Sequence, residues 1–260
     1  MSLNYQKILG IRVTISSKVK ILEEIRKYLL SVRAKGVEPL ILATPNPEQI
    51  VLAQRNKAFA DFLNRADITL PDGVGIVWAS RFLDKRQSLR RIPGVEFMEE
   101  LVELAKKQRI RIGLIGGYAG LAVRAFECLR QKHPGVKGWV VEPGALSIGN
   151  FGDLSDLGEK IKKTKTQIVF VGLGAPKQEF LIDALSRQLS VVGRPVIFMS
   201  VGGSFDILAG RLQRAPVIMR LIGFEWFWRF VQQPWRWRRQ MALFTFVWLV
   251  IKEKMLRRQK

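Results

Sequence analysis

The chain has 260 residues, a length that allows one large domain or one domain with an appendage. Because 48% of the residues are hydrophobic, the chain can bury a full core, and disorder over most of its length is excluded. The chain has a single cysteine, Cys128, which excludes an internal disulfide. It also has a single histidine, His133, so no His/Cys cluster is available and a zinc site is disfavoured. The formal net charge of +21 predicts an anionic partner, which could be a nucleic acid, an anionic lipid or a phosphorylated substrate.

The chain alternates between two kinds of apolar pattern. Apolar residues that recur every three or four positions predict helices, and short continuous apolar runs predict buried strands. In chain order the predicted segments are a helix at 19–30, a strand at 40–43, a helix at 48–64, a strand at 68–70, a helix at 97–107, a strand at 111–115, a helix at 121–131, strands at 139–141 and 168–171, a helix ending near residue 188 and a strand at 196–199. This order predicts an α/β fold with a largely parallel, Rossmann-like sheet and helices on both faces.

Polar residues follow two of the predicted strands, where a parallel sheet places its ligand crevice. Asp72, followed by Gly73, comes after the strand at 68–70, and its carboxylate could act as a general base toward an attacking hydroxyl. Thr44 and Asn46 come after an earlier strand and could contact sugar hydroxyls. For all three side chains the alternative is a turn or helix-capping role.

An arginine pair, Arg90 and Arg91, precedes a Pro-Gly turn. Guanidinium groups suit phosphate oxygens, although a solvated basic face is the ordinary alternative. No Asp-x-Asp pair stands at a predicted strand end. A nucleotide-sugar enzyme with this sequence would therefore stabilise its leaving diphosphate with arginines, Lys177 and helix N-termini in place of Mg²⁺. We accordingly expect neither a metal nor an organic cofactor.

Glycine-rich turns follow three further predicted strands. Backbone N–H groups at the helix starts after such turns can hold a phosphate. The first two turns do not complete the G-x-G-x-x-G fingerprint of a dinucleotide site. The candidate binding residues of these turns are Gly116, Gly117, Gly174, Pro176, Lys177, Gln178, Glu179, Gly203 and Asp206.

The composition changes near Arg214, so we expect an α/β catalytic domain at 1–213 and a helical appendage at 214–260. The appendage holds eleven Lys or Arg against two acids, and five of the seven tryptophans. Its apolar run at 241–251 is about half the length of a membrane span. Flanking basic and Trp residues predict a helix in an anionic bilayer interface, with a helix packed on the main domain as the alternative. Nucleic acid is not expected, because the aromatics lie beside long apolar runs.

Several short motifs occur in a fixed order, as part of a resemblance that extends from about residue 8 to residue 240. They are Thr44-x-Asn46, Asp72-Gly73, Arg91-Ile92-Pro93-Gly94, Gly174-x-Pro176-x-Gln178-Glu179, Gly202-Gly203-x-Phe205-Asp206, Arg214-Ala215-Pro216 and Gly223-x-Glu225-Trp226. Together they resemble the WecG/TagA/CpsF glycosyltransferases. Two positions depart from the family pattern: Glu96 stands where the family often has Asp, and Arg90 competes with Arg91 for the motif arginine.

The resemblance implies an inverting, metal-independent transferase that moves a sugar, N-acetylmannosamine or a relative, from UDP to a polyprenyl-diphosphate-linked sugar in bacterial cell-envelope polysaccharide or teichoic acid synthesis. It implies Asp72 as the base for the acceptor hydroxyl and Thr44 and Asn46 near the reacting centre. Arg91, Gln178 and tail arginines would bind the donor or its diphosphate. We therefore expect a peripheral protein on the cytoplasmic face of the membrane. The sequence leaves open which sugar and acceptor are used, and whether the protein is a homo-oligomer.

Two other classes remain open. A nucleotide-dependent oxidoreductase would use the glycine turns, although these lack the full dinucleotide fingerprint. A non-enzymatic protein that binds membranes or nucleic acid would use the basic tail, although this reading leaves the polar residues at the strand ends unexplained.

Overall fold

A computed structural model describes residues 1–31, 37–86, 89–142, 154–190, 193–221, 224–234 and 237–258. The motif glycine Gly223 and the tail residues Trp235, Arg236 and Lys260 lie outside these ranges. The strands are β1 (Tyr5–Ile8), β2 (Ile11–Thr14), β3 (Leu40–Ala43), β4 (Ile68–Thr69), β5 (Arg111–Gly116), β6 (Lys137–Val141), β7 (Thr166–Gly172) and β8 (Ile197–Ser200). The helices are α1 (Lys18–Leu30), α2 (Pro47–Arg55), α3 (Lys57–Arg65), α4 (Val74–Leu83), α5 (Gly94–Lys107), α6 (Leu121–Lys132), α7 (Leu154–Lys163), α8 (Lys177–Leu189), α9 (Ser204–Leu208), α10 (Val217–Leu221), α11 (Glu225–Gln232) and α12 (Trp237–Arg258).

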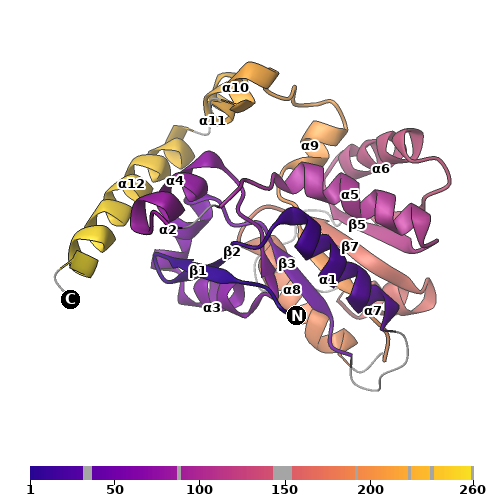
Figure 1. The fold of residues 1–260 in the computed structure, drawn as a ribbon. Helices are drawn as coiled ribbons and strands as arrows, with labels where there is room; N and C mark the ends of the chain where they lie inside the picture. The colour runs from indigo at the N-terminus through magenta and orange to yellow at the C-terminus, as the bar shows by residue number, and fades with distance from the viewer. Residues whose placement is uncertain are drawn as a thin grey trace.

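The centre of the molecule is a six-stranded sheet in the order β4-β3-β8-β7-β5-β6. Every neighbouring pair in it is parallel. Helices lie on both sides of this sheet, and β1 and β2 form a separate antiparallel hairpin (Figure 1). The predicted α/β fold with a parallel, helix-covered sheet is therefore confirmed.

The two faces of the sheet bury different side chains, because successive residues of a strand point to opposite sides. On β7, Phe170 belongs to the cluster that includes α1, α5 and α6, whereas Val169 belongs to the cluster that includes α2, α3 and α8. Both residues are fully buried. This two-sided burial explains why the strands read as continuous apolar runs.

The prediction of a single helix at 48–64 is wrong, because the segment forms two helices that meet at Asn56. Asn56 has an extended backbone, and its side-chain oxygen accepts a hydrogen bond of 3.0 Å from the backbone N–H of Phe59. The residue thus caps α3, and asparagine favours such a cap over a helix interior.

Helix α4 was not predicted, although it starts directly after Gly73, whose φ of +100° suits glycine. Its first turn holds a β-branched valine and another glycine, which weaken the helical signal. The hairpin β1–β2 and the helices α7 and α9 were not predicted either, whereas α10 and α11 fall in the 214–260 segment that was expected to be helical. The predicted helix at 97–107 begins three residues earlier, at Gly94.

The C-terminal helix α12 lies along α2 and α4 (Figure 1). Its residues Phe246 and Val250 are buried in the core of the main domain, while Phe244 and Trp248 on other faces are 69% and 60% exposed. The expected helix is present, and one face of it packs on the main domain. Within the described residues, no helix has both the length and the apolar content needed to cross a bilayer.

Candidate active site

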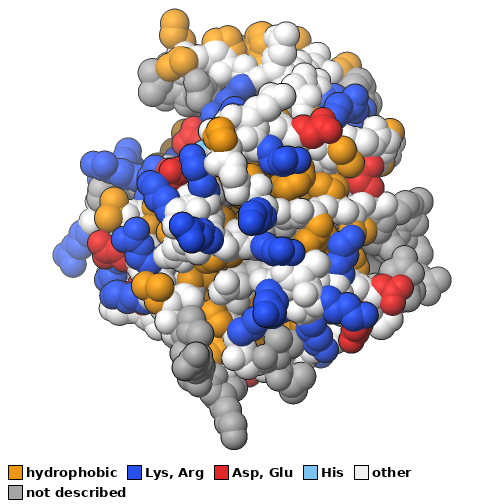
Figure 2. All heavy atoms as spheres, turned by 90° about the vertical axis from the view of Figure 1, so that its right-hand side faces the viewer, with side chains coloured by type: hydrophobic (Ala, Val, Ile, Leu, Met, Phe, Trp, Pro, Cys, Tyr) orange, Lys and Arg blue, Asp and Glu red, His pale blue; other side chains and the backbone are white. Residues whose placement is uncertain are grey.

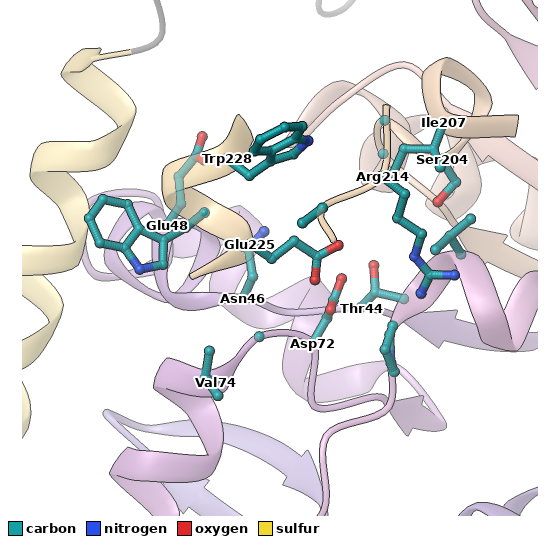
Figure 3. Close-up of a pocket in the computed structure, with 18 of the residues that line it drawn as sticks. Thr44, Asn46, Glu48, Asp72, Val74, Ser204, Ile207, Arg214, Glu225 and Trp228 are labelled. Carbon is teal, nitrogen blue, oxygen red and sulfur yellow. The ribbon is translucent and has the colours of Figure 1, made fainter. Parts of the chain in front are cut away.

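A pocket of about 240 Å³ opens at the carboxyl ends of β3, β4 and β8. The loops that follow these three neighbouring strands supply Thr44, Asp72 and Gly203 to its wall. Figure 3 shows Asp72 and Thr44 pointing toward the same space, with Glu225 approaching from the C-terminal segment. The Asp72 carboxylate, the Thr44 hydroxyl and the Asn46 amide therefore line one pocket, at the edge where an open α/β sheet holds its ligands.

Backbone hydrogen bonds hold the Asp72 loop in place. The Asp72 N–H donates to the Pro45 carbonyl at 3.3 Å, and the Ile92 N–H donates to the Pro71 carbonyl at 3.0 Å. Gly94 starts α5 beside this loop, and a Cβ there would lie 3.3 Å from Thr44 Cγ2 and 3.6 Å from Asp72 Oδ2. Three segments distant in the sequence are thus joined around the Asp72 carboxylate.

Thr44 and Asn46 both line the pocket, and each already uses part of its hydrogen-bonding capacity. The Thr44 hydroxyl donates to the Ser200 carbonyl at 3.1 Å, so it would face a ligand mainly as an acceptor. The Asn46 side-chain oxygen accepts from the Gln49 N–H at 2.9 Å and caps α2. The capping alternative therefore holds for Asn46, and the group that Asn46 can offer a ligand is its amide nitrogen.

Arg91 lines the pocket, whereas Arg90 is exposed and does not. The Arg91 guanidinium lies 3.7 Å from Asp72 Oδ1 and donates to Glu225. Burial lowers the pKa of Arg91, but the carboxylates of Asp72, Glu225 and Glu96 outweigh it and leave the pKa raised. Arg91 is therefore a fixed cation at the pocket, and of the two arginines it is the one that lines the pocket.

The C-terminal segment closes one side of the pocket. Glu225, Trp226 and Trp228 of α11 and Leu243 of α12 line it, and Arg214 enters from the connection after α9 (Figure 3). Arg214 pairs with Glu96. The sequence motifs contained Glu225 and Trp226, but nothing in the sequence indicated that they meet Asp72. Glu48, Trp228 and Leu243, also in the lining, had no signal in the sequence.

The third glycine turn reaches the pocket, and the other two do not. Gly203 lines it, whereas Gln178 and Glu179 are buried beneath the turn. The Gln178 side chain accepts from the Gly202 N–H at 3.0 Å and donates to the Glu179 carboxylate at 2.7 Å. Burial raises the pKa of Glu179 to about 7, against the opposing hydrogen bond from Gln178. This pair supports the pocket floor from below.

The remaining predicted binding residues lie elsewhere. Gly116 and Gly117 precede α6, whose N-terminus is occupied by the Glu142 carboxylate, which accepts from the Gly120 and Ala122 N–H groups at 2.8 and 2.6 Å. The Asp206 carboxylate oxygen Oδ1 lies 3.7 Å from the Arg211 guanidinium nitrogen Nη1. Ligand binding stays a prediction for all the glycine-turn residues outside the pocket lining, which are Gly116, Gly117, Gly174, Pro176, Lys177, Gln178, Glu179 and Asp206.

Positive charge extends well beyond the pocket. Lys and Arg side chains spread across the face of the molecule shown in Figure 2, which is the side that carries α5 and α6 in Figure 1. Carboxylates on that face are fewer. The excess charge is therefore distributed over the main domain and is not a property of the tail alone.

The chain is similar in sequence to known transferases. The chain is 30% identical over 214 residues to the N-acetylglucosaminyldiphosphoundecaprenol N-acetyl-beta-D-mannosaminyltransferase of Bacillus subtilis (strain 168), covering 82% of this chain and 80% of that protein. It is 29% identical over 249 residues to the Staphylococcus aureus (strain MW2) protein of the same name, and the match covers 95% of this chain and 92% of that protein. The sequence model of the Glycosyl transferase WecG/TagA/CpsF family matches residues 6–260, so the chain belongs to that family.

Proposed function

We propose that this protein transfers an N-acetylhexosamine, N-acetylmannosamine or a relative, from UDP to a sugar carried on a polyprenyl diphosphate. The observation that carries the proposal is the position of Asp72 in a pocket that also holds Arg91 and Arg214. A base and two cations are what acceptor activation and diphosphate departure require. Similarity to two transferases whose names specify an undecaprenyl-diphosphate-linked acceptor supports the choice of acceptor.

In the proposed reaction, the acceptor hydroxyl binds next to the Asp72 carboxylate. As its oxygen attacks the anomeric carbon, the hydroxyl proton passes to Asp72, and the bond from that carbon to the UDP oxygen breaks on the opposite face. The configuration is therefore inverted. Thr44 and Asn46 would orient the sugar hydroxyls beside the reacting carbon, through the lone pairs of Thr44 and the amide nitrogen of Asn46.

The leaving diphosphate would be stabilised by Arg91 and Arg214. Both guanidinium groups are partly buried, with 20% and 30% of the side chain exposed, so their charge is less screened than on an open surface. Each is paired with a carboxylate, Arg91 with Glu225 and Arg214 with Glu96. A diphosphate entering the pocket would compete with these carboxylates for the same N–H donors.

Membrane association is part of the proposal, because the acceptor carries a lipid. Supporting it are apolar side chains on α10, α11 and α12 that face solvent, among them Ile218, Phe227, Trp248 and Met255. Lys252 lies 5.3 Å from the Trp248 ring centroid on the same helix. Trp with neighbouring Lys is the composition of a helix at an anionic bilayer surface. We expect the protein to act peripherally at the cytoplasmic face, with the 214–260 segment as the contacting appendage.

The decisive experiment presents the protein with a panel of UDP-sugars and a short-chain lipid-diphosphate N-acetylglucosamine, and measures UDP release. We expect release that requires both substrates and that is largest with one N-acetylated donor. Absence of release with every pair would overturn the proposal. Nicotinamide or flavin absorbance in the purified protein would instead favour an oxidoreductase.

A further inference from the structure

Two stripes of apolar side chains, most of them exposed, leave the active-site pocket side by side. On α4, Val74, Trp78 and Phe82 recur at four-residue intervals, which places them on one helix face. On α12, Leu243, Val247 and Ile251 recur in the same way. The first residue of each stripe, Val74 and Leu243, lines the pocket itself.

The two helices run parallel, so the stripes stay together along their length. At the start of α4, a Cβ on Gly75 would lie 3.8 Å from the Phe246 ring of α12. At its end, Lys254 of α12 donates to the Leu83 carbonyl at 2.7 Å. Figure 1 shows α4 and α12 lying next to each other. The stripe from Val74 to Phe82 therefore runs for about 12 Å away from the pocket, at the 1.5 Å rise of a helix.

These side chains remain open to solvent. Val74, Trp78, Phe82, Val247 and Ile251 are between 36% and 40% exposed. The Trp78 and Phe82 rings are stacked, with centroids 5.2 Å apart, and so form one aromatic pair along this face of α4. An apolar surface that starts inside a ligand pocket and has no cover from the described part of the chain suits an apolar extension of the ligand.

We propose that the polyprenyl chain of the acceptor leaves the pocket between these stripes, so that its first isoprene units lie against α4 and α12. This inference rests on the proposed function. In such an acceptor the sugar and diphosphate are polar and the group after them is hydrocarbon, so an apolar path must begin where the polar site ends. A bilayer-contact surface has no reason to begin at Val74 and Leu243, two residues of the pocket wall.

The first test compares two acceptors with the same N-acetylglucosamine diphosphate head, one with a long polyprenyl chain in detergent and one with a single prenyl unit in water. Trp78→Gln and Val247→Gln should raise KM for the long-chain acceptor about tenfold, from the loss of apolar contact, with kcat unchanged. KM for the short-chain acceptor should stay as in the wild type. Val19→Gln, an exposed valine on α1, is the matched control and should change neither value.

Equal KM changes for both acceptors, or none for either, would overturn the proposed path. So would a loss of flotation with anionic vesicles in Trp78→Gln without any dependence on chain length, since that result assigns the stripe to the bilayer.

A second readout does not depend on turnover. A polyprenyl-diphosphate N-acetylglucosamine with a benzophenone on its second isoprene unit is irradiated with the full-length protein, and the labelled peptides are sequenced. Labels on α4 at Trp78 or Phe82 and on α12 at Val247 or Ile251 support the path. Labels confined to Phe244 and Trp248 contradict it. If the wild type released no UDP but gave the expected labels, the proposed function would fail while the lipid path stood.

Discussion

The Arg91 guanidinium holds Glu225, a residue 134 positions further along the chain, beside the pocket. The same guanidinium lies 3.7 Å from Asp72. One cation thus connects the candidate base to the C-terminal segment. Because a diphosphate would compete with Glu225 for this cation, donor binding and the position of α11 are expected to be coupled.

Asp72→Asn should abolish most turnover and leave the fold intact. The amide keeps the size of the side chain but cannot accept the hydroxyl proton, and loss of a general base costs about 10²- to 10⁴-fold in rate. UDP release under saturating substrates measures the effect, and circular dichroism with thermal unfolding checks the fold. Near-normal turnover in a folded variant would remove Asp72 from the proposed mechanism.

Glu225→Gln should destabilise the docking of α11. The pair with Arg91 is partly buried, so we expect a loss of about 1–2 kcal/mol, between the values for exposed and for fully buried pairs. Urea unfolding measures the loss, and limited proteolysis should show faster cleavage near α11. Glu159→Gln is the control, since its pair with Lys163 is largely exposed and should matter little. Equal effects of the two variants would contradict the docking role.

Glu179 should make stability depend on pH. Its pKa is about 7 in the folded protein because of burial, against an ordinary value of 4.5. Between these values the folded state keeps a proton that the unfolded chain has lost, so stability falls as pH rises from about 4.5 to 7 and does not change further above that. The full change for this group is about 3 kcal/mol.

Glu179→Gln tests this dependence, because the amide resembles the protonated acid and does not titrate. Urea unfolding at pH 5 and at pH 7.5 should show a smaller decrease in stability for the variant than for the wild type. The same decrease in both proteins would assign the pH dependence to other groups.

Phe244→Glu and Trp248→Glu should weaken flotation with anionic vesicles while leaving the protein folded. Both side chains point away from the core, and each change replaces apolar area with a negative charge. Point variants are better than truncation, because removing α12 would also remove the buried Phe246 and Val250. Phe246→Ala is the contrasting variant, which we expect to lose about 3–5 kcal/mol of stability. Unchanged flotation in both glutamate variants would show that α12 is not the contact.

The elements that could be predicted from the sequence are those with a local signal. Strand β3 has its predicted bounds, since continuous apolar runs mark buried strands, and Thr44, Asn46 and Asp72 reach the pocket because strand ends meet at one edge of the sheet. The break at Asn56 was missed because apolar residues continue on both sides of it. The contact of Arg91 with Glu225 could not be predicted, because it depends on how the last helices fold back. The same holds for Glu142 at the N-terminus of α6, where an intramolecular carboxylate lies in the place expected for a phosphate.

The pocket is lined both by Thr44, near the start of the chain, and by Leu243, near its end. During translation the sheet and its loops can emerge and fold well before the last helix leaves the ribosome, yet the pocket lacks a wall until that helix docks. A nascent or prematurely terminated chain would therefore have Asp72 in place without a closed site around it.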